Sequence, residues 1–188
     1  MTVTLEPTPL SGLLILRQTV AADDRGYFME VFVRREFSRA GLPTEFLQDN
    51  QSHSKKNVIR GLHFQWDPPQ GKLIRVAAGE AFVVAVDIRK NSSTQGKWFG
   101  KTMSPRVKEQ LWAPPGFATG FCALVDDTDV QYKCTAEYNP ARESGIRWND
   151  PNVGITWPAA SPVLSPKDAS AQLLSDWLVR PESESFRL

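Results

Sequence analysis

The sequence is poor in the side chains that bind metals or form disulfides. Its 188 residues include only two histidines and two cysteines. No CxxC pair or cluster of cysteine and histidine is present, which argues against a structural zinc site. Cys122 and Cys134 flank a predicted hairpin, and its register decides whether they share a face. A disulfide between them stays open, although free thiols are favoured in a chain without an export signal.

Long apolar runs and an excess of one charge are also missing. No run approaches the ~20 apolar residues of a membrane helix, and the N-terminus lacks the charged-then-apolar pattern of a signal peptide. The formal net charge is +1, which gives no bulk attraction to nucleic acid or to an anionic membrane. We therefore expect a cytoplasmic protein that binds neither, and in which any anion site is local.

Short strand-like runs fill most of the chain, and glycine, proline, asparagine and aspartate separate them. Helical character is limited to residues 34–40, closed by Gly41, and to a short stretch at 169–178. Because strands and helices do not alternate, the pattern predicts an all-β sandwich or barrel. The length suits one domain over residues 1–188, in which residues 159–188 form a C-terminal appendage.

Residues 57–75 combine strand-like alternation with basic side chains. Alternation places Arg60 on one face of a strand and His63 on the other. A turn at Pro68-Pro69 leads to a second strand that begins at Lys72. Adjacent strands can thus bring a cation, an imidazole and an ammonium to one pocket wall, as an anionic or enolate-like ligand requires. A histidine in a strand is also often only structural, and both interpretations stay open at this point.

Further motifs follow in a specific order and spacing. They are Asp24–Glu30, Gln48–Asn50, Arg60–Gln65, Gln70–Leu73, Val86–Arg89, Trp112–Phe121, Tyr132–Cys134, Asp150-Pro151 and Ser165–Asp168. Together they resemble the dTDP-4-dehydrorhamnose 3,5-epimerase family, and the resemblance covers most of the chain. It implies a cupin-type jelly roll (a double-stranded β-helix) with a few short helices. It also implies an isomerase that inverts the carbons adjacent to the ketone of a 4-keto-6-deoxyhexose nucleotide.

Epimerisation beside a ketone needs a base, an acid on the other side of the ring, and positive charge to hold the enolate. His63 is the plausible base, because an imidazole titrates near neutral pH. The resemblance implies that Asp168 supports His63, that Tyr132 is the acid and that Lys72 steadies the enolate oxygen. Without the resemblance, we would interpret Asp168 as a helix N-cap, Tyr132 as a core residue and Lys72 as a solvated strand end.

The resemblance also implies a site for the nucleotide diphosphate. Arg25, Arg60 and Lys167 match contacts to the phosphates, for which arginine forms bidentate hydrogen bonds. In this family Arg25 and Glu30 reach the neighbouring subunit's site, so a homodimer is implied. The other implied contacts are polar groups to the base and sugar and an aromatic ring that stacks on thymine, namely Glu30, Gln48, Asn50, Glu143 and Tyr138.

One position departs from the family's pattern. The family usually reads Gly-Phe-Ala-His-Gly-Phe, and Thr119 takes the place of the histidine, where a contact to the substrate near the reacting carbonyl is implied. A threonine hydroxyl still donates one hydrogen bond, but it carries no charge and reaches less far. Two alternatives therefore stay open: a single-centre (3- or 5-) epimerase or ketoisomerase acting on a related keto-sugar nucleotide, and a non-catalytic cupin that binds a sugar nucleotide.

The same position bears on metal binding. Many cupins hold a metal with two or three histidines and a glutamate, whereas Thr119 and Gln65 stand where further ligands would be needed. The only other imidazole, His53, is predicted to lie in an exposed loop. We therefore expect no metal and no cofactor, which leaves His63 free to act as a base.

Overall fold

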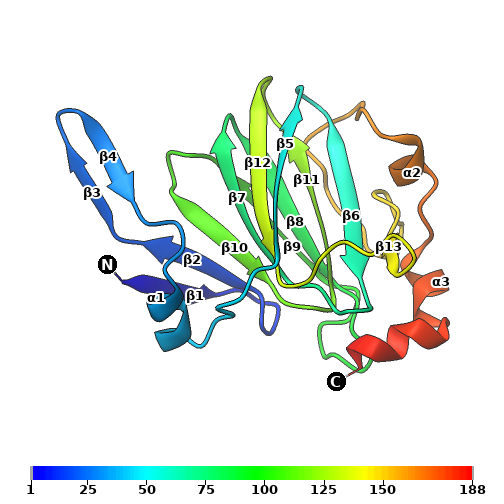
Figure 1. Cartoon of the computed structure of the whole chain (residues 1–188). Coiled ribbons are helices and arrows are strands. Elements are labelled where there is room, and N and C mark those ends of the chain that lie inside the picture. The colour runs from blue at the N-terminus through cyan, green and yellow to red at the C-terminus, as the bar shows by residue number, and fades with distance from the viewer. Residues whose placement is uncertain (1, 188) are drawn as a thin grey trace.

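A computed structural model of the chain describes residues 2–187 (Figure 1). Short strands dominate it, and the helices have six residues or fewer. The strands are β1 (Val3–Pro7), β2 (Leu14–Gln18), β3 (Val20–Asp23), β4 (Gly26–Met29), β5 (Gln48–Ser54), β6 (Ile59–Gln65), β7 (Lys72–Ala78), β8 (Ala81–Asp87), β9 (Trp98–Met103), β10 (Glu109–Ala113), β11 (Phe117–Ala123), β12 (Thr128–Cys134) and β13 (Glu143–Gly145). The helices are α1 (Arg34–Arg39), α2 (Pro166–Ala169), α3 (Leu174–Leu178) and the 3-10 helix η1 (Pro181–Phe186).

Two antiparallel sheets form the body of the protein. One has the strand order β1-β2-β10-β7-β12-β5 and the other β13-β6-β11-β8-β9, while β3 and β4 form a separate hairpin that projects from the body (Figure 1). Strands that follow one another in sequence often lie in different sheets, as β6 and β7 do. The all-β sandwich that the sequence pattern predicts is confirmed, and it is the jelly roll that the family resemblance implies, with a few short helices at its margins.

The core lies between the inner faces of the two sheets. Ile74 and Val76 of β7 and Val130 of β12 pack there against Val83 of β8 and Phe121 of β11. The run from Ala81 to Val86 is almost wholly buried, because the C-terminal segment covers the outer face of β8. Each fully buried aliphatic side chain contributes about 1.5–3 kcal/mol. This packing therefore holds the two sheets rigidly on either side of the space between them.

The C-terminal segment packs against the outer face of the five-stranded sheet. Trp177 of α3 is fully buried, and its ring centroid lies 4.5 Å from that of Phe64 on β6. The single helix predicted over 169–178 is instead two helices, because Gln172 between them forms an isolated parallel bridge with Ile146, directly after β13. The division into a domain and an appendage from 159 stays a prediction, and residues 1 and 188 lie outside the described residues.

Two pairs of consecutive strands that were predicted to lie side by side in one sheet lie in different sheets. The turn at 126–129 does not close a hairpin within one sheet, since it carries the chain from β11 in one sheet to β12 in the other. The turn after β6 likewise crosses between sheets, so His63 and Lys72 face each other across the roll rather than side by side. Cys122 and Cys134 consequently lie in different sheets, and both are buried free thiols.

Candidate active site

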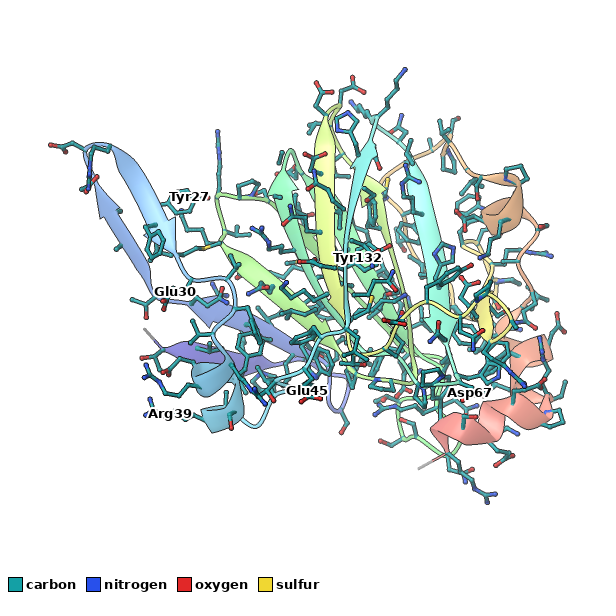
Figure 2. The ribbon with its side chains drawn as sticks, viewed as in Figure 1. Tyr27, Glu30, Arg39, Glu45, Asp67 and Tyr132 are labelled. Atoms are coloured by element: carbon teal, nitrogen blue, oxygen red, sulfur yellow. The ribbon has the colours of Figure 1, made fainter. Side chains whose placement is uncertain are left out.

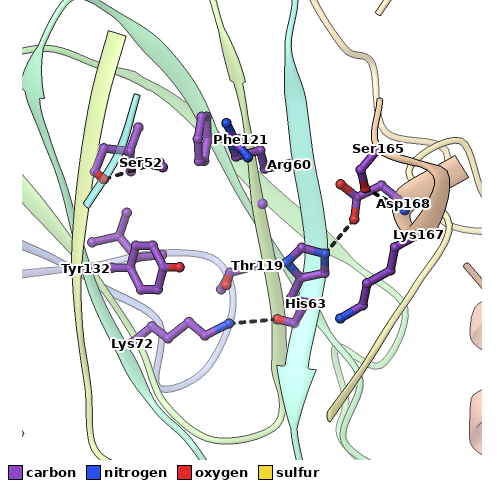
Figure 3. Close-up of a pocket in the computed structure, with 13 residues that line it drawn as sticks. Ser52, Arg60, His63, Lys72, Thr119, Phe121, Tyr132, Ser165, Lys167 and Asp168 are labelled. Carbon is purple, nitrogen blue, oxygen red and sulfur yellow. Dashed lines mark hydrogen bonds and ion pairs between the residues drawn. The ribbon is translucent and has the colours of Figure 1, made fainter. Parts of the chain in front are cut away.

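A cavity of about 240 Å³ opens between the two sheets (Figure 3). Its walls come from β5, β7 and β12 on one side and from β6, β11 and α2 on the other. The lining side chains mix basic, acidic, hydroxyl and apolar groups: Ser52, Arg60, His63, Lys72, Ile74, Thr119, Gly120, Phe121, Val130, Tyr132, Ser165, Lys167 and Asp168.

An irregularity in β6 shapes one wall of this cavity. His63 pairs with Thr119 of β11 and Arg60 pairs with Phe121, so two residues of β6 face one residue of β11. Such a bulge reverses the alternation of side chains beyond it. Arg60 and His63 therefore both line the cavity. The prediction that alternation separates them onto opposite faces is wrong for this reason.

Two glycines make the close approach at the bulge possible. Gly61 has a φ of 129°, a region that side chains rarely adopt, and a Cβ atom there would lie 2.6 Å from the Cα atom of Gly120. A Cβ atom on Gly120 would lie 2.7 Å from the carbonyl oxygen of Arg60. Any side chain at either position would push β6 and β11 apart, and with them the residues that line the cavity.

His63 and Asp168, 105 residues apart, meet at one wall of the cavity. His63 Nε2 lies 2.6 Å from Asp168 Oδ1, with side-chain exposures of 32% and 6% (Figure 3). Asp168 is not the helix N-cap that its position suggested. Ser165 is the N-cap of α2, because Pro166 takes the first helical position, and Asp168 lies within the helix.

The environment keeps Asp168 ionised. Burial raises the pKa of its carboxyl group, but the hydrogen bond and charge of His63 and further hydrogen bonds lower it more, so the net pKa lies below its usual value. A carboxylate only accepts hydrogen bonds, so Nε2 of His63 carries the proton of this contact. The unshared pair of a neutral His63 then resides on Nδ1, which points into the cavity (Figure 3). The arrangement is that of a base held in one tautomer.

Tyr132 stands on the opposite wall. It comes from β12, and its hydroxyl group points across the cavity toward the His63 ring (Figure 3). Burial raises the pKa of the Tyr132 phenol above its ordinary value. The phenol therefore keeps its proton at neutral pH, the state in which it can act as an acid.

Lys72 bridges the two walls. It begins β7, and its Nζ donates a hydrogen bond of 3.2 Å to the carbonyl oxygen of His63 in the other sheet. Nζ also lies 6.0 Å from the ring centroid of Tyr132. Burial lowers the pKa of Lys72. The amino group of Lys72 thus lies between the candidate base and the candidate acid.

Further cations and a hydroxyl group lie around the cavity. Arg60 Nε donates to Ser54 Oγ at 3.1 Å, and its Nη2 donates to the carbonyl oxygen of His53, also at 3.1 Å. Lys167 pairs with Glu143 at 2.6 Å. Thr119 is buried and lies directly across from His63 in the sheet. These contacts leave the Arg60 and Lys167 side chains on the lining of the cavity, where an anion would meet them.

Hydrogen bonds link three of the predicted contact residues near the start of β5, although none of the three is part of the cavity lining. Gln48 Nε2 donates to Asn50 Oδ1 at 2.8 Å, and Gln48 Oε1 accepts the backbone N–H of Tyr138 at 2.7 Å. Asn50 Nδ2 in turn donates to Cys134 Sγ at 3.6 Å. The ring of Tyr138 remains exposed, with 54% of the residue accessible to solvent. Three predicted contact residues are therefore linked to one another at one edge of the site.

Two predicted contact residues lie elsewhere. Arg25 is at the tip of the β3–β4 hairpin with a side-chain exposure of 90%, and it pairs there with Asp23 at 2.6 Å. Glu30 follows the same hairpin, and Figure 2 shows it on that side of the molecule, well away from Tyr132. Within residues 2–187 of one chain, neither reaches the cavity.

Some lining residues were missed by sequence reasoning. Ser52 and Val130 lie two positions from Asn50 and Tyr132 on the same strands, so strand alternation would have found them. Ser165 had a signal as well, since a serine followed by proline and, three residues on, by an acid is typical of a helix start. Phe121 had the same signal as Ser52 and Val130, because it lies two positions from Thr119 on β11.

Neither a metal site nor a membrane span is evident in the described part of the chain. No group of three or more histidine, cysteine, aspartate or glutamate side chains within residues 2–187 is placed to hold a metal ion. None of the helices in this range has the length and apolar character needed to cross a membrane. A jelly roll that presents an imidazole–carboxylate pair, a phenol and an ammonium to one cavity is suited to moving protons on and off a substrate, so the chain has the features of a proton-transferring isomerase.

The comparisons with known proteins specify this class further. The family model described as dTDP-4-dehydrorhamnose 3,5-epimerase matches residues 7–176. The dTDP-4-dehydrorhamnose 3,5-epimerase of Methanothermobacter thermautotrophicus is 52% identical over 80% of this chain and 82% of its own length. The chain belongs to the dTDP-4-dehydrorhamnose 3,5-epimerase family.

Two other relatives bear on substrate and outcome. The dTDP-6-deoxy-D-glucose-3,5-epimerase of Legionella pneumophila, solved in complex with dTDP-4-keto-L-rhamnose, superimposes with a TM-score of 0.90 at 43% identity and covers 96% of each chain. A more distant relative, the dTDP-4-dehydrorhamnose 3-epimerase of Streptomyces niveus, is 35% identical over 92% of this chain and 84% of its own length.

Proposed function

We propose that this protein inverts the two carbons adjacent to the ketone of a dTDP-linked 4-keto-6-deoxyhexose. The family and the names of its relatives support this activity. The observation that carries it is the contact of 2.6 Å between His63 and Asp168, placed opposite Tyr132 across the cavity. A protein that merely binds a sugar nucleotide has no need of a supported base and a protonated phenol on facing walls.

The proposed chemistry transfers protons in balanced steps. His63 Nδ1 removes the proton from a carbon beside the ketone, and the electron pair of that C–H bond moves to the ketone oxygen. The Lys72 ammonium stabilises the resulting enolate, and the Asp168 carboxylate stabilises the imidazolium. Tyr132 then donates its proton to the opposite face of the same carbon. Exchange with water returns His63 and Tyr132 to their starting states before the second carbon reacts.

The nucleotide would bind at the open end of the cavity. Arg60 and Lys167 supply positive charge for the diphosphate, and arginine can bind phosphate oxygens in pairs. Thr119, deep in the site, would donate to the substrate near its carbonyl group. The polar contacts to sugar and base would come from Glu143 and from the chain of residues along β5, Gln48 and Asn50, with Tyr138 stacking on the base.

We further propose a homodimer in which Arg25 and Glu30 complete the partner's site. The β3–β4 hairpin supports this, because it projects from the body and exposes Tyr27 (51%) and Phe28 (62%) (Figure 1). An isolated two-stranded hairpin is marginal in water, so a partner surface would stabilise it. The cytoplasmic location also stays a prediction.

Mixing two inactive variants tests the shared site. Arg25→Ala and His63→Ala should each be inactive or severely impaired alone. After unfolding and refolding together in equal amounts, half of the dimers combine one chain of each kind, and one of their two sites is intact. About a quarter of the wild-type activity should return. No recovery in mixed dimers isolated by differential tagging would contradict a site shared between subunits.

A second candidate function is inversion of one carbon only. Two observations favour it: Thr119 stands where the family usually has a histidine, and the Streptomyces niveus relative is a 3-epimerase. Proton exchange separates the two functions. In deuterated water, a two-centre enzyme places a deuteron at each carbon that flanks the ketone, whereas a single-centre enzyme labels one carbon.

The same experiment tests the catalytic pair. His63→Ala and Asp168→Asn should abolish or severely slow deuterium incorporation into dTDP-4-keto-6-deoxyglucose, followed by proton NMR. His53→Ala is the matched control, because the exposed His53 also contacts an aspartate, Asp129, at 2.8 Å, and it should exchange at the wild-type rate. Undiminished exchange in both the His63 and Asp168 variants would rule out the proposed base.

A further inference from the structure

The carboxylate that supports His63 belongs to a helix too short to be stable by itself. Asp168 belongs to α2, which has only four residues and lies in the C-terminal segment. A helix of this length is not stable by itself, because its backbone makes too few hydrogen bonds to offset the cost of ordering it. Asp168 is nevertheless almost fully buried and within 2.6 Å of His63. Some other contact must hold it there.

Ser165 makes that contact. Its Oγ accepts the backbone N–H of Asp168 at 3.1 Å, while its own backbone is extended, as is typical of an N-cap (Figure 3). A serine hydroxyl can accept and donate at once, so its proton is free for a second partner. The hydroxyl of Ser165 and the backbone N–H of Gly61 also help to lower the pKa of the Asp168 carboxyl group. Ser165 thus holds the main chain of Asp168 and favours the ionised form of its side chain.

The bulge in β6 also influences the Asp168 carboxylate. Gly61, which lies against Gly120 at the bulge, is the other residue whose backbone N–H lowers the pKa of the Asp168 carboxyl group. The position of this N–H is fixed by the sheet, whereas the hydroxyl of Ser165 belongs to one exposed side chain at the edge of the cavity. A serine side chain can be replaced without moving the strand, which makes its role separable by experiment.

We propose that Ser165 is a positioning residue for catalysis, which orients Asp168 so that its carboxylate holds the proton of His63 on Nε2 and leaves Nδ1 facing the substrate. The role rests on the proposed base function of His63. Without the Ser165 hydroxyl, α2 loses its N-cap hydrogen bond, so the backbone of Asp168 is less firmly held and its side chain samples other positions. The fraction of His63 in the reactive tautomer and orientation then falls, and the rate falls with it, while the groups that bind the nucleotide stay in place.

Three variants of the full-length protein test this role. Ser165→Ala removes the hydroxyl, and Ser165→Thr restores one. Ser170→Ala is the matched control, because Ser170 caps the other end of α2 through the carbonyl oxygen of Pro166. We expect Ser165→Ala to lower kcat by about tenfold at most, as loss of an N-cap hydrogen bond does, with KM changed by less than about twofold. Ser165→Thr should recover most of the rate, and Ser170→Ala should equal the wild type.

An NMR measurement reads out the His63–Asp168 contact without turnover. With ¹⁵N-labelled histidine, the Nε2–H proton of His63 should give a downfield signal that is lost in Asp168→Asn. The signal should be weakened or lost in Ser165→Ala and retained in Ser165→Thr and Ser170→Ala. The backbone spectrum of each variant shows whether it is folded, and Ser165→Thr keeps the test decisive if Ser165→Ala is not.

Three results would overturn the role of Ser165. One is an unchanged kcat and imidazole signal in Ser165→Ala. Another is a raised KM with an unchanged kcat, which would make Ser165 a substrate contact. The third is a folded Ser165→Thr variant as impaired as Ser165→Ala. If the wild type instead shows no epimerisation at all, the proposed function fails, and the NMR signals alone still decide whether Ser165 orients Asp168.

Discussion

Replacing Gly61 by alanine should destabilise the protein through two separate effects. A φ of 129° suits glycine almost alone, and forcing an alanine to adopt it costs about 1–3 kcal/mol. The added Cβ atom would also lie 2.6 Å from the Cα atom of Gly120, whereas carbon atoms prefer about 3.5–4.0 Å, so β6 and β11 must separate by roughly 1 Å. Overpacking of this kind costs a further ~1–3 kcal/mol. The free energy of unfolding should therefore fall by about 2–6 kcal/mol.

Gly26→Ala isolates the steric part of this effect. Gly26 has nearly the same backbone angle, with a φ of 132°, but nothing lies within 4 Å of the position that a Cβ atom would take. It should lose only the conformational part, about 1–3 kcal/mol. Thermal and denaturant unfolding of both variants give the difference, and Gly61→Ala should melt about 5–20 °C below the wild type. Equal losses in the two variants would refute the idea that the contact between the two glycines sets the distance between β6 and β11.

Three further predictions concern single side chains. Loss of the Lys72 charge should make kcat/KM fall at alkaline pH, with a midpoint below ~10.4, because burial lowers the pKa of Lys72. Tyr132 should lose its proton only at higher pH, because burial raises the pKa of its phenol. Lys72→Arg, if it retains activity, should move the midpoint of this fall to higher pH. Thr119→Val should lower kcat/KM by about fivefold through the loss of one hydrogen bond, and NMR should show which carbon still exchanges. Cys122 and Cys134 should react with a thiol reagent only after unfolding, because both are buried and burial raises the pKa of each thiol.

The positions of the strands were predictable from the sequence, but the pairing of strands within each sheet was not. The run at 81–86 indicates a buried strand because it is apolar on both faces, and Gly41 indicates the end of α1. A tight turn, however, has the same composition whether it joins two strands of one sheet or crosses between two sheets. The turns after β6 and β11 both cross. His53 shows a related limit, since its polar neighbours predict a loop, whereas it lies exposed on β5 at the edge of its sheet.

The site residues likewise divide into those that the nearby sequence identifies and those that only the folding of the whole chain brings together. Residue type alone suggested His63 as a base, whereas the roles of Lys72 and Tyr132 were implied by the family resemblance, and the structure brings all three to one cavity. Nothing in the local sequence brings Asp168 to His63, because the contact depends on the path of the whole C-terminal segment. The alternation rule also failed for Arg60, since a bulge adds one residue that no periodic pattern reveals.

The candidate base and the candidate acid belong to different sheets, which links catalysis to the thickness of the core. The gap between the two rings is set by the bulk of apolar side chains such as Ile74, Val130 and Phe121, none of which exchanges a proton. Larger or smaller residues there would change the distance between the two sheets. They would thereby change the space in which a sugar ring can present one face to the base and the other to the acid. A change in these apolar residues alone should therefore alter which carbon is inverted, with every reactive side chain left in place.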